Sequence, residues 1–196
     1  MSLPTRSICQ HLLSVSLKPQ KSISCLMSAT SYKYEALNIT QPAPFVFSVE
    51  LNRPAKLNAL NQVMLTELGC VFSKLDQDPD CRAVVLSGGG AMFSAGVDLA
   101  DLTQLASVVG GEEDITRKAM TVYQTIHQVQ TCVTQMEKCK KPVICCVHHG
   151  CVGAGVDMIT ATDIRLCTED AWFCVKEVDI MDTYNSFWFE TNSNLN

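Results

Sequence analysis

The chain has 196 residues, of which 47% are hydrophobic and 18% are charged, and its formal net charge is -5. These values are typical of a soluble globular protein with one domain and its own core. The acidic balance disfavours a nucleic-acid surface, which is normally basic, and no apolar run approaches the ~20 residues of a membrane span.

Residues 1–34 have the composition of a targeting segment. They contain no acidic residue and eight serines. Their basic residues are Arg6, Lys18, Lys21 and Lys33. Such a start is typical of a transit peptide for the mitochondrial matrix. An ordinary disordered tail has the same composition, and both interpretations exclude this segment from the fold. The C-terminal residues 193–196 are not a peroxisomal address of the SKL type.

The next part of the chain predicts a strand, a loop and a helix. Residues 31–44 form a short polar lead-in, and apolar side chains then alternate over residues 45–51, as in a strand with one buried face. A loop follows over residues 52–60, and Asn61 can cap a helix that extends to about residue 77. The apolar residues at helical spacing are Met64, Leu65, Leu68, Val71, Phe72 and Leu75.

A buried strand over residues 82–87 leads into a glycine-rich loop and a helix that begins at Asp98. The loop has neither the GxxxxGK(S/T) pattern nor a GxGxxG that opens a helix, so a nucleoside triphosphate site is not expected. A long amphipathic helix is predicted from about 115 to 138, and its apolar stripe indicates core packing. The stripe consists of Ile115, Ala119, Val122, Ile126, Val129, Val133 and Met136.

The stretch 141–157 organises the chain. An apolar run suited to a buried strand is followed by Gly153, Ala154 and Gly155, and then by the carboxylate of Asp157. We interpret it as a strand, a glycine turn and a helix whose first N–H groups point at a ligand. This arrangement suits the stabilisation of a developing oxyanion while a nearby carboxylate moves a proton. A plain strand-to-helix turn needs the same glycines, so the stretch alone leaves both interpretations open.

The rest of the chain predicts a short helix to about residue 161 and two short strands, over 163–167 and 171–175. Glu177 follows, and the Asn-rich residues 181–196 predict a disordered tail. Strands that alternate with helices predict an α/β fold.

Two strand–loop–helix units then offer backbone N–H groups around Val97 and Ala154. Two carboxylates, Asp157 and Glu177, come from neighbouring elements. Such a set of N–H donors and carboxylates suits a carbonyl substrate whose neighbouring carbon exchanges a proton. The plainer alternative is that Asp157 and Glu177 are ordinary surface carboxylates.

The eleven cysteines do not suggest disulfides or a metal site. Their count is odd, and Cys145 and Cys146 are adjacent, so reduced and buried thiols are expected. These two residues, together with His148, His149 and Cys151, are the best metal candidate. Alternate strand residues face opposite sides and the chain has no paired CxxC, so no metal is predicted.

Several motifs resemble the crotonase family, also called the enoyl-CoA hydratase/isomerase family, over residues 45 to 180. They are Asn52-Arg53-Pro54 with Asn58-Ala59-Leu60; Phe93-Ser94-Ala95-Gly96-Val97-Asp98-Leu99; Lys141-Pro142-Val143 running on to Gly153-Ala154-Gly155-Val156-Asp157; Asp163-Ile164-Arg165; and Val175-Lys176-Glu177-Val178. The resemblance implies a crotonase-like spiral of ββα units that binds a fatty acyl-CoA thioester.

Within this family, Asp157 and Glu177 most resemble the acids of mitochondrial dienoyl-CoA isomerases. The resemblance implies an isomerase of fatty-acid β-oxidation that converts a 3,5-dienoyl-CoA to a 2,4-dienoyl-CoA through a dienolate. It makes Asp157 and Glu177 catalytic and assigns the oxyanion hole to the N–H groups of Val97 and Ala154. The implied substrate-binding residues are Asn58, Ala59, Gly96, Val97, Asp98, Leu99, Ala100 and Ala154. No cofactor is implied, since the coenzyme A thioester is the substrate.

The family pattern stops at about Ile180, before a further acid and a C-terminal helical region. We therefore expect a truncated form in which residues 35–180 are an acyl-CoA-binding core that is incomplete at the C-terminus. The resemblance implies a homotrimer or hexamer, which we do not expect this chain to form alone. Two alternatives stay open: an enoyl-CoA hydratase that uses the same acids, and a non-catalytic form that binds acyl-CoA or full-length partners. A peroxisomal location is also possible within the family.

Overall fold

The structure is a computed structural model that describes residues 32–111 and 114–176. Residues 1–31 of the predicted transit peptide lie outside the described residues. Glu177 and the predicted C-terminal tail also lie outside them. The elements are β1 (Leu37–Ala43), β2 (Val46–Leu51), the 3-10 helix η2 (Pro54–Lys56), α2 (Gln62–Gln77), β3 (Ala83–Gly88), α3 (Leu99–Gly110), α4 (Ile115–Glu137), β4 (Val143–Val147), β5 (Gly150–Val152), α5 (Ala154–Thr160), β6 (Ile164–Cys167) and β7 (Trp172–Cys174).

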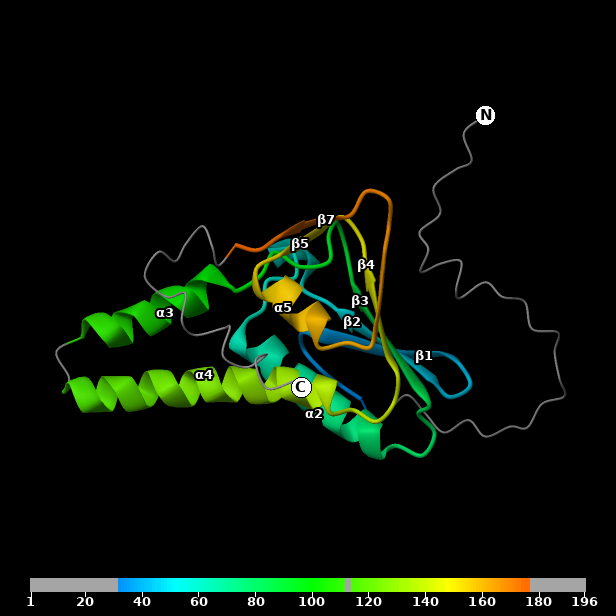
Figure 1. The fold of residues 1–196 in the computed structure, drawn as a ribbon, viewed down its shortest axis with the longest axis horizontal. Helices are drawn as coiled ribbons and strands as arrows, with labels where there is room; N and C mark the ends of the chain where they lie inside the picture. The colour runs from blue at the N-terminus through cyan, green and yellow to red at the C-terminus, as the bar shows by residue number, and fades with distance from the viewer. Residues whose placement is uncertain (1–31, 112–113, 177–196) are drawn as a thin grey trace, which may run out of the picture.

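Five strands form the main sheet, in the order β1-β2-β3-β4-β6 (Figure 1). β1 and β2 are antiparallel, and the other three pairs are parallel. Parallel neighbours require crossover connections, which α2 supplies between β2 and β3, and α3 with α4 supplies between β3 and β4. A second sheet pairs β5 with β7 in parallel. The predicted α/β class is confirmed.

The predicted polar lead-in over residues 31–44 is wrong, because residues 37–43 form β1. Leu37 and Ile39 are buried and face the core from this strand, which pairs with β2. The apolar alternation covers only these two positions before Thr40, Gln41 and Pro42, and so it is too short to indicate a strand. A proline is tolerated here because β1 is an edge strand of the sheet.

The core lies between α2 and the sheet. All six apolar residues predicted on this helix are buried, together with Gly69. They belong to one buried cluster with strand residues such as Val49, Leu51 and Leu86. The Asn61 side chain accepts a hydrogen bond from Met64 N at 3.0 Å, which confirms the predicted N-cap.

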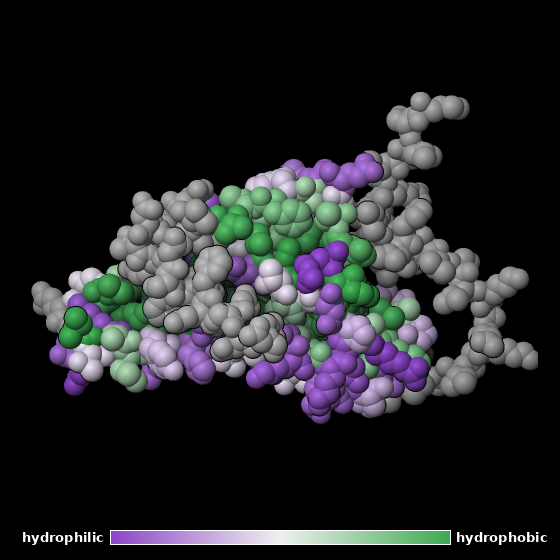
Figure 2. Space-filling view, in the orientation of Figure 1, coloured by the Kyte–Doolittle hydropathy of each residue, from purple (hydrophilic) through white to green (hydrophobic). Residues whose placement is uncertain are grey.

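α4 has the predicted extent, but the prediction that its whole stripe packs in the core is wrong. Only Cys132 and Met136 are buried on this helix, and Ile115 is 80% exposed. α3 and α4 pack against each other and extend together beyond the sheet (Figure 1). Apolar side chains reach the surface at that end (Figure 2). Within the described ranges, no helix is long and apolar enough to cross a membrane.

Candidate active site

Three loops meet beyond the carboxyl ends of the parallel strands. They are residues 52–60 after β2, residues 89–98 after β3, and the segment 148–157 that contains β5 and the start of α5. In α/β sheets this end is where ligands bind. We call these segments the first, second and third loops.

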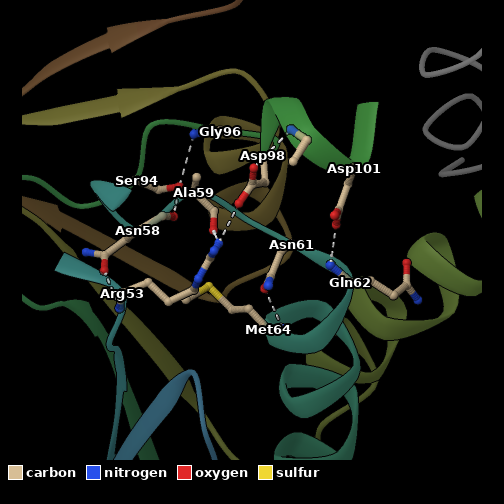
Figure 3. Close-up of polar contacts among 11 residues, drawn as sticks. Arg53, Asn58, Ala59, Asn61, Gln62, Met64, Ser94, Gly96, Asp98 and Asp101 are labelled. Atoms are coloured by element: carbon tan, nitrogen blue, oxygen red, sulfur yellow. Dashed lines mark hydrogen bonds and ion pairs between the residues drawn. The ribbon is translucent and has the colours of Figure 1, made fainter. Parts of the chain in front are cut away.

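The buried side chain of Asn58 holds the first loop in place through hydrogen bonds to backbone groups. Its side chain is fully buried, and its amide nitrogen lies 2.7, 3.0 and 3.1 Å from the carbonyl oxygens of Gly89, Met92 and Phe93. Its Oδ1 accepts from the backbone N–H of Arg53 at 2.9 Å (Figure 3). Asn58 has a φ of 53°, in the left-handed region that asparagine tolerates. The side chain therefore ties the first loop to the second.

Ser94 joins all three loops. It is fully buried, and its Oγ donates to Asn58 O at 2.9 Å and accepts from Gly96 N at 3.2 Å. On its other side, Ser94 N donates to Gly150 O at 3.2 Å, and Val152 N donates to Ser94 O at 3.0 Å. The second loop is therefore held between the first and the third.

Gly96 brings the second loop against the third. Its φ is 88°, and a β-carbon there would lie 2.8 Å from Val152 O and 3.8 Å from Ala154 N. Glycine is required on both counts. The two predicted oxyanion donors, Val97 and Ala154, thus lie on facing loops. In the described part of the chain, neither N–H group is among the donors of the backbone hydrogen bonds that join these loops.

Asp157 lies on the first turn of α5, three residues after Ala154. Its Oδ2 atom is buried. Burial, followed by the nearby charge of Asp157, raises the pKa of the Cys151 thiol to about 12. Gly155 completes the packing, since a β-carbon there would lie 3.1 Å from Ser94 Cβ and 3.4 Å from Cys151 Sγ. The predicted catalytic carboxylate therefore belongs to the same packed region as the loops.

Asp98 and Arg53 form an ion pair beside the second loop. Arg53 Nη1 lies 2.9 Å from Asp98 Oδ2 and donates to Ala59 O at 2.5 Å (Figure 3). Asp98 Oδ1 accepts from Ala100 N at 3.1 Å and so caps α3. The Ala100 hydrogen bond and the Arg53 guanidinium hold the pKa of Asp98 below its ordinary value. The carboxylate of Asp98 therefore anchors the loop.

The structure gathers most of the predicted site residues. Residues 58–59 and 96–100 lie in the first two loops and the start of α3, and Ala154 and Asp157 lie at the start of α5. Leu99 is 72% exposed and faces outward. Glu177 lies outside the described residues. Sequence reasoning assigned no role to Arg53 or Ser94, although both lie in the quoted motifs.

The histidines next to the third loop have other partners. His148 Nε2 lies 3.0 Å from Gly90 O, and His149 Nδ1 lies 3.8 Å from Asp170 Oδ2. Over residues 32–111 and 114–176, no three His, Cys, Asp or Glu side chains are grouped as metal ligands.

Comparison with known proteins identifies the family. Residues 44–191 match the family model of enoyl-CoA hydratase/isomerase. The chain belongs to the enoyl-CoA hydratase/isomerase family. Two solved structures share the fold and confirm a crotonase-like core. An enoyl-CoA hydratase from Shewanella pealeana has a TM-score of 0.65 and 26% identity, and covers 75% of this chain and 52% of its own. A probable enoyl-CoA hydratase/isomerase from Mycobacterium abscessus has a TM-score of 0.58 and 31% identity, with the same coverage.

Three relatives carry more specific names. The chain is 43% identical to the human mitochondrial Δ(3,5)-Δ(2,4)-dienoyl-CoA isomerase over 177 residues, which are 90% of this chain and 54% of the relative. It is 46% identical to the mitochondrial isomerase of Rattus norvegicus over 77% of this chain and 46% of the relative. The peroxisomal isomerase of Arabidopsis thaliana is 40% identical over 79% and 55%. The chain thus spans about half the length of these relatives.

Proposed function

We propose that this chain forms the acyl-thioester site of an isomerase that converts a 3,5-dienoyl-CoA into a 2,4-dienoyl-CoA. The observation that carries the proposal is the close approach of Gly96 to Ala154, beside Asp157. A thioester oxygen between Val97 and Ala154 would accept from two backbone N–H groups, as developing negative charge requires. The names of the human, rat and Arabidopsis relatives support the same substrate class.

The proposed reaction moves one proton along a conjugated chain. A base removes a proton from C2, and the electron pair spreads onto the thioester oxygen as a dienolate. A proton then adds at C6, which leaves double bonds at C2 and C4. The oxyanion donors act on the intermediate more strongly than on the substrate, which is how they lower the barrier. No oxidant or reductant is consumed, so the coenzyme A of the substrate is the only cofactor-like group required.

Asp157 and Glu177 exchange the protons in this proposal. Asp157 lies one helical turn from Ala154, so that a carboxylate and an oxyanion donor come from the same end of α5. Glu177, outside the described residues, follows β7 by three residues along the chain, and β7 pairs with β5 in the third loop. This closeness along the chain supports its assignment as the second acid.

We also propose that the protein acts in mitochondria. Residues 1–34 are basic and free of acids, and the human and rat relatives are named as mitochondrial, whereas the Arabidopsis relative is named as peroxisomal. Residues 1–40 fused to a fluorescent reporter should direct it to mitochondria. A diffuse cytosolic signal would contradict this location.

The activity is tested by giving the 196-residue chain a 3,5-dienoyl-CoA and a 2-enoyl-CoA in separate reactions. A 2,4-dienoyl-CoA product, identified by chromatography and by its longer-wavelength absorbance, is the expected result. A hydroxyacyl-CoA formed only from the 2-enoyl substrate would replace the isomerase with a hydratase. No product in either reaction would contradict an enzymatic role for this chain.

A further inference from the structure

We propose that Arg53 is a positioning residue for the N–H of Val97 and acts through the carboxylate of Asp98. The inference rests on the proposed function, because it concerns the oxyanion side of that site. Arg53 comes from the first loop and Asp98 from the second (Figure 3). Val97 is the residue before Asp98 in the second loop. Arg53 is thus a connection between loops rather than a group that contacts the reacting atoms.

The orientation of Val97 depends on how closely the first loop holds the second. Leu60 N donates to Gly96 O at 2.7 Å, and Asp98 N donates to Leu60 O at 3.0 Å. These bonds form an isolated parallel bridge between Leu60 and Val97. In a parallel bridge of this kind, the N–H of the bridged residue points away from its partner. Leu60 therefore directs the Val97 N–H away from the first loop.

The Arg53 side chain reinforces the bridge between Leu60 and Val97. Its Nη1 contacts Ala59 O, in the residue before Leu60, and Asp98 Oδ2, in the residue after Val97. One guanidinium nitrogen therefore links the neighbours of both bridged residues. The Arg53 and Asp98 side chains are only 20% and 17% exposed, so their attraction is less screened than that of a surface pair.

The start of α3 has little other support. None of the residues of α3 is buried, so packing holds this helix weakly. Asp98 caps its first turn through Ala100 N. Asp101 Oδ2 adds one link to α2 by accepting from Gln62 N at 2.6 Å. Loss of the Arg53 contact should therefore let residues 97–98 and the start of α3 shift, because no buried side chain of α3 fixes them and only the Leu60 bridge and the Asp101 link remain.

Three variants and a matched control test the inference. Asp98→Asn keeps an N-cap acceptor of the same size and removes the charge that faces Arg53. Arg53→Gln removes the other partner, and Arg53→Lys restores the charge. The control is Asp114→Asn, since Asp114 caps α4 in the same way, through Thr116 N at 2.9 Å. Asp114 takes part in none of the ion pairs among the described residues.

With a 3,5-dienoyl-CoA substrate, Asp98→Asn and Arg53→Gln should lower kcat at least about tenfold. A displaced Val97 N–H would stabilise the negative charge on the thioester oxygen less well in the transition state. KM should change by less than about threefold, since ground-state binding needs the donor less. Arg53→Lys should recover part of kcat, and Asp114→Asn should match the wild type. A fall in thermal stability with wild-type kcat and KM would overturn the inference, because that is the signature of a merely structural pair.

Amide hydrogen exchange at positions 96 and 98, whose N–H groups donate to Ser94 Oγ and Leu60 O, separates this inference from the proposed function, because it requires no turnover. Exchange should accelerate at least about tenfold in Asp98→Asn and Arg53→Gln, and stay unchanged in Asp114→Asn. Wild-type exchange rates in both variants would overturn the positioning role, whatever the chain catalyses. Faster exchange in a chain that leaves 3,5-dienoyl-CoA intact would support the positioning of Val97 and contradict the proposed function.

Discussion

Gly96 lies against Val152 so closely that a β-carbon at position 96 would be 2.8 Å from the Val152 carbonyl oxygen. Its φ of 88° is a second reason for glycine, because other residues seldom adopt this conformation. Ala154 follows Val152 by two residues, so the same contact sets the separation of the two proposed oxyanion donors. The geometry of the site therefore depends on the absence of one side chain.

Gly96→Ala should lower the free energy of unfolding by about 2–4 kcal/mol, since it combines left-handed strain with a backbone clash. Gly110→Ala is the matched control, because a β-carbon there meets nothing within 4 Å and alanine favours a helix. It should leave stability within about 1 kcal/mol of the wild type. Urea unfolding of both variants measures the difference, and equal stabilities would mean that the loops do not approach as described.

Asn58→Ala should destabilise the fold by about 2–4 kcal/mol, because three carbonyl oxygens would lose their buried donor. Asn38→Ala removes an asparagine from an exposed contact with Glu50 and should cost less than about 0.5 kcal/mol. Chemical denaturation of the two variants provides the comparison. A similar loss in both would show that Asn58 does not hold the first two loops together.

The sequence predicted most of the regular elements because their patterns are local. α2 and α4 begin and end within one residue of their predicted limits. Their apolar side chains recur every three or four residues, which only a helix places on one face. The strands β3, β4 and β6 were predicted from short apolar runs and are confirmed. Their order in the parallel sheet, in which they are neighbours, was not predicted.

The remaining features depend on contacts between distant parts of the chain. The apolar face of α4 indicates that another element can pack against it, but it does not indicate which one. In the structure, the first half of α4 extends past the core. The role of Asn58 depends on carbonyl groups more than thirty residues later. At the site, the facing positions of residues 97 and 154 could be expected from the glycine-containing motifs, and the oxyanion role of Val97 and Ala154 stays a prediction. The Arg53–Asp98 contact could not be expected, because nothing local in the sequence indicates which charged residues of two loops form an ion pair. Glu177 stays a prediction.

Acid should remove the contribution of Asp98 to stability. Its pKa is lowered in the folded chain, so the unfolded chain takes up the proton first as the pH falls. The stabilisation is present above the ordinary pKa of about 3.9 and is lost as the pH falls through the folded value. The thermal midpoint of the wild type should exceed that of Asp98→Asn by a constant amount from pH 7 to about 5, and this gap should shrink below about pH 4. A gap that widens on acidification would contradict the assignment.

Cys151 should resist thiol reagents in the folded protein. It is fully buried and its pKa is raised to about 12, so little thiolate is present at pH 8. Cys70 and Cys167 are exposed and serve as internal controls. Peptide mass spectrometry after iodoacetamide treatment should show both modified at least about a hundredfold faster than Cys151, and denaturant should remove the difference. Rapid native labelling of Cys151 would mean that the loops around it are open.

Isomerisation of a 3,5-dienoyl-CoA in deuterium oxide tests the central claim most directly. The 196-residue chain should form 2,4-dienoyl-CoA that carries deuterium at C6, because the proton added there comes from an exchangeable acid. Glu177→Gln should slow the reaction on the order of a hundredfold or more with little change in thioester binding. Asp80→Asn, in an exposed turn, should leave it unchanged. Near-wild-type turnover in Glu177→Gln, or a hydroxyacyl product in place of the diene, would contradict the account.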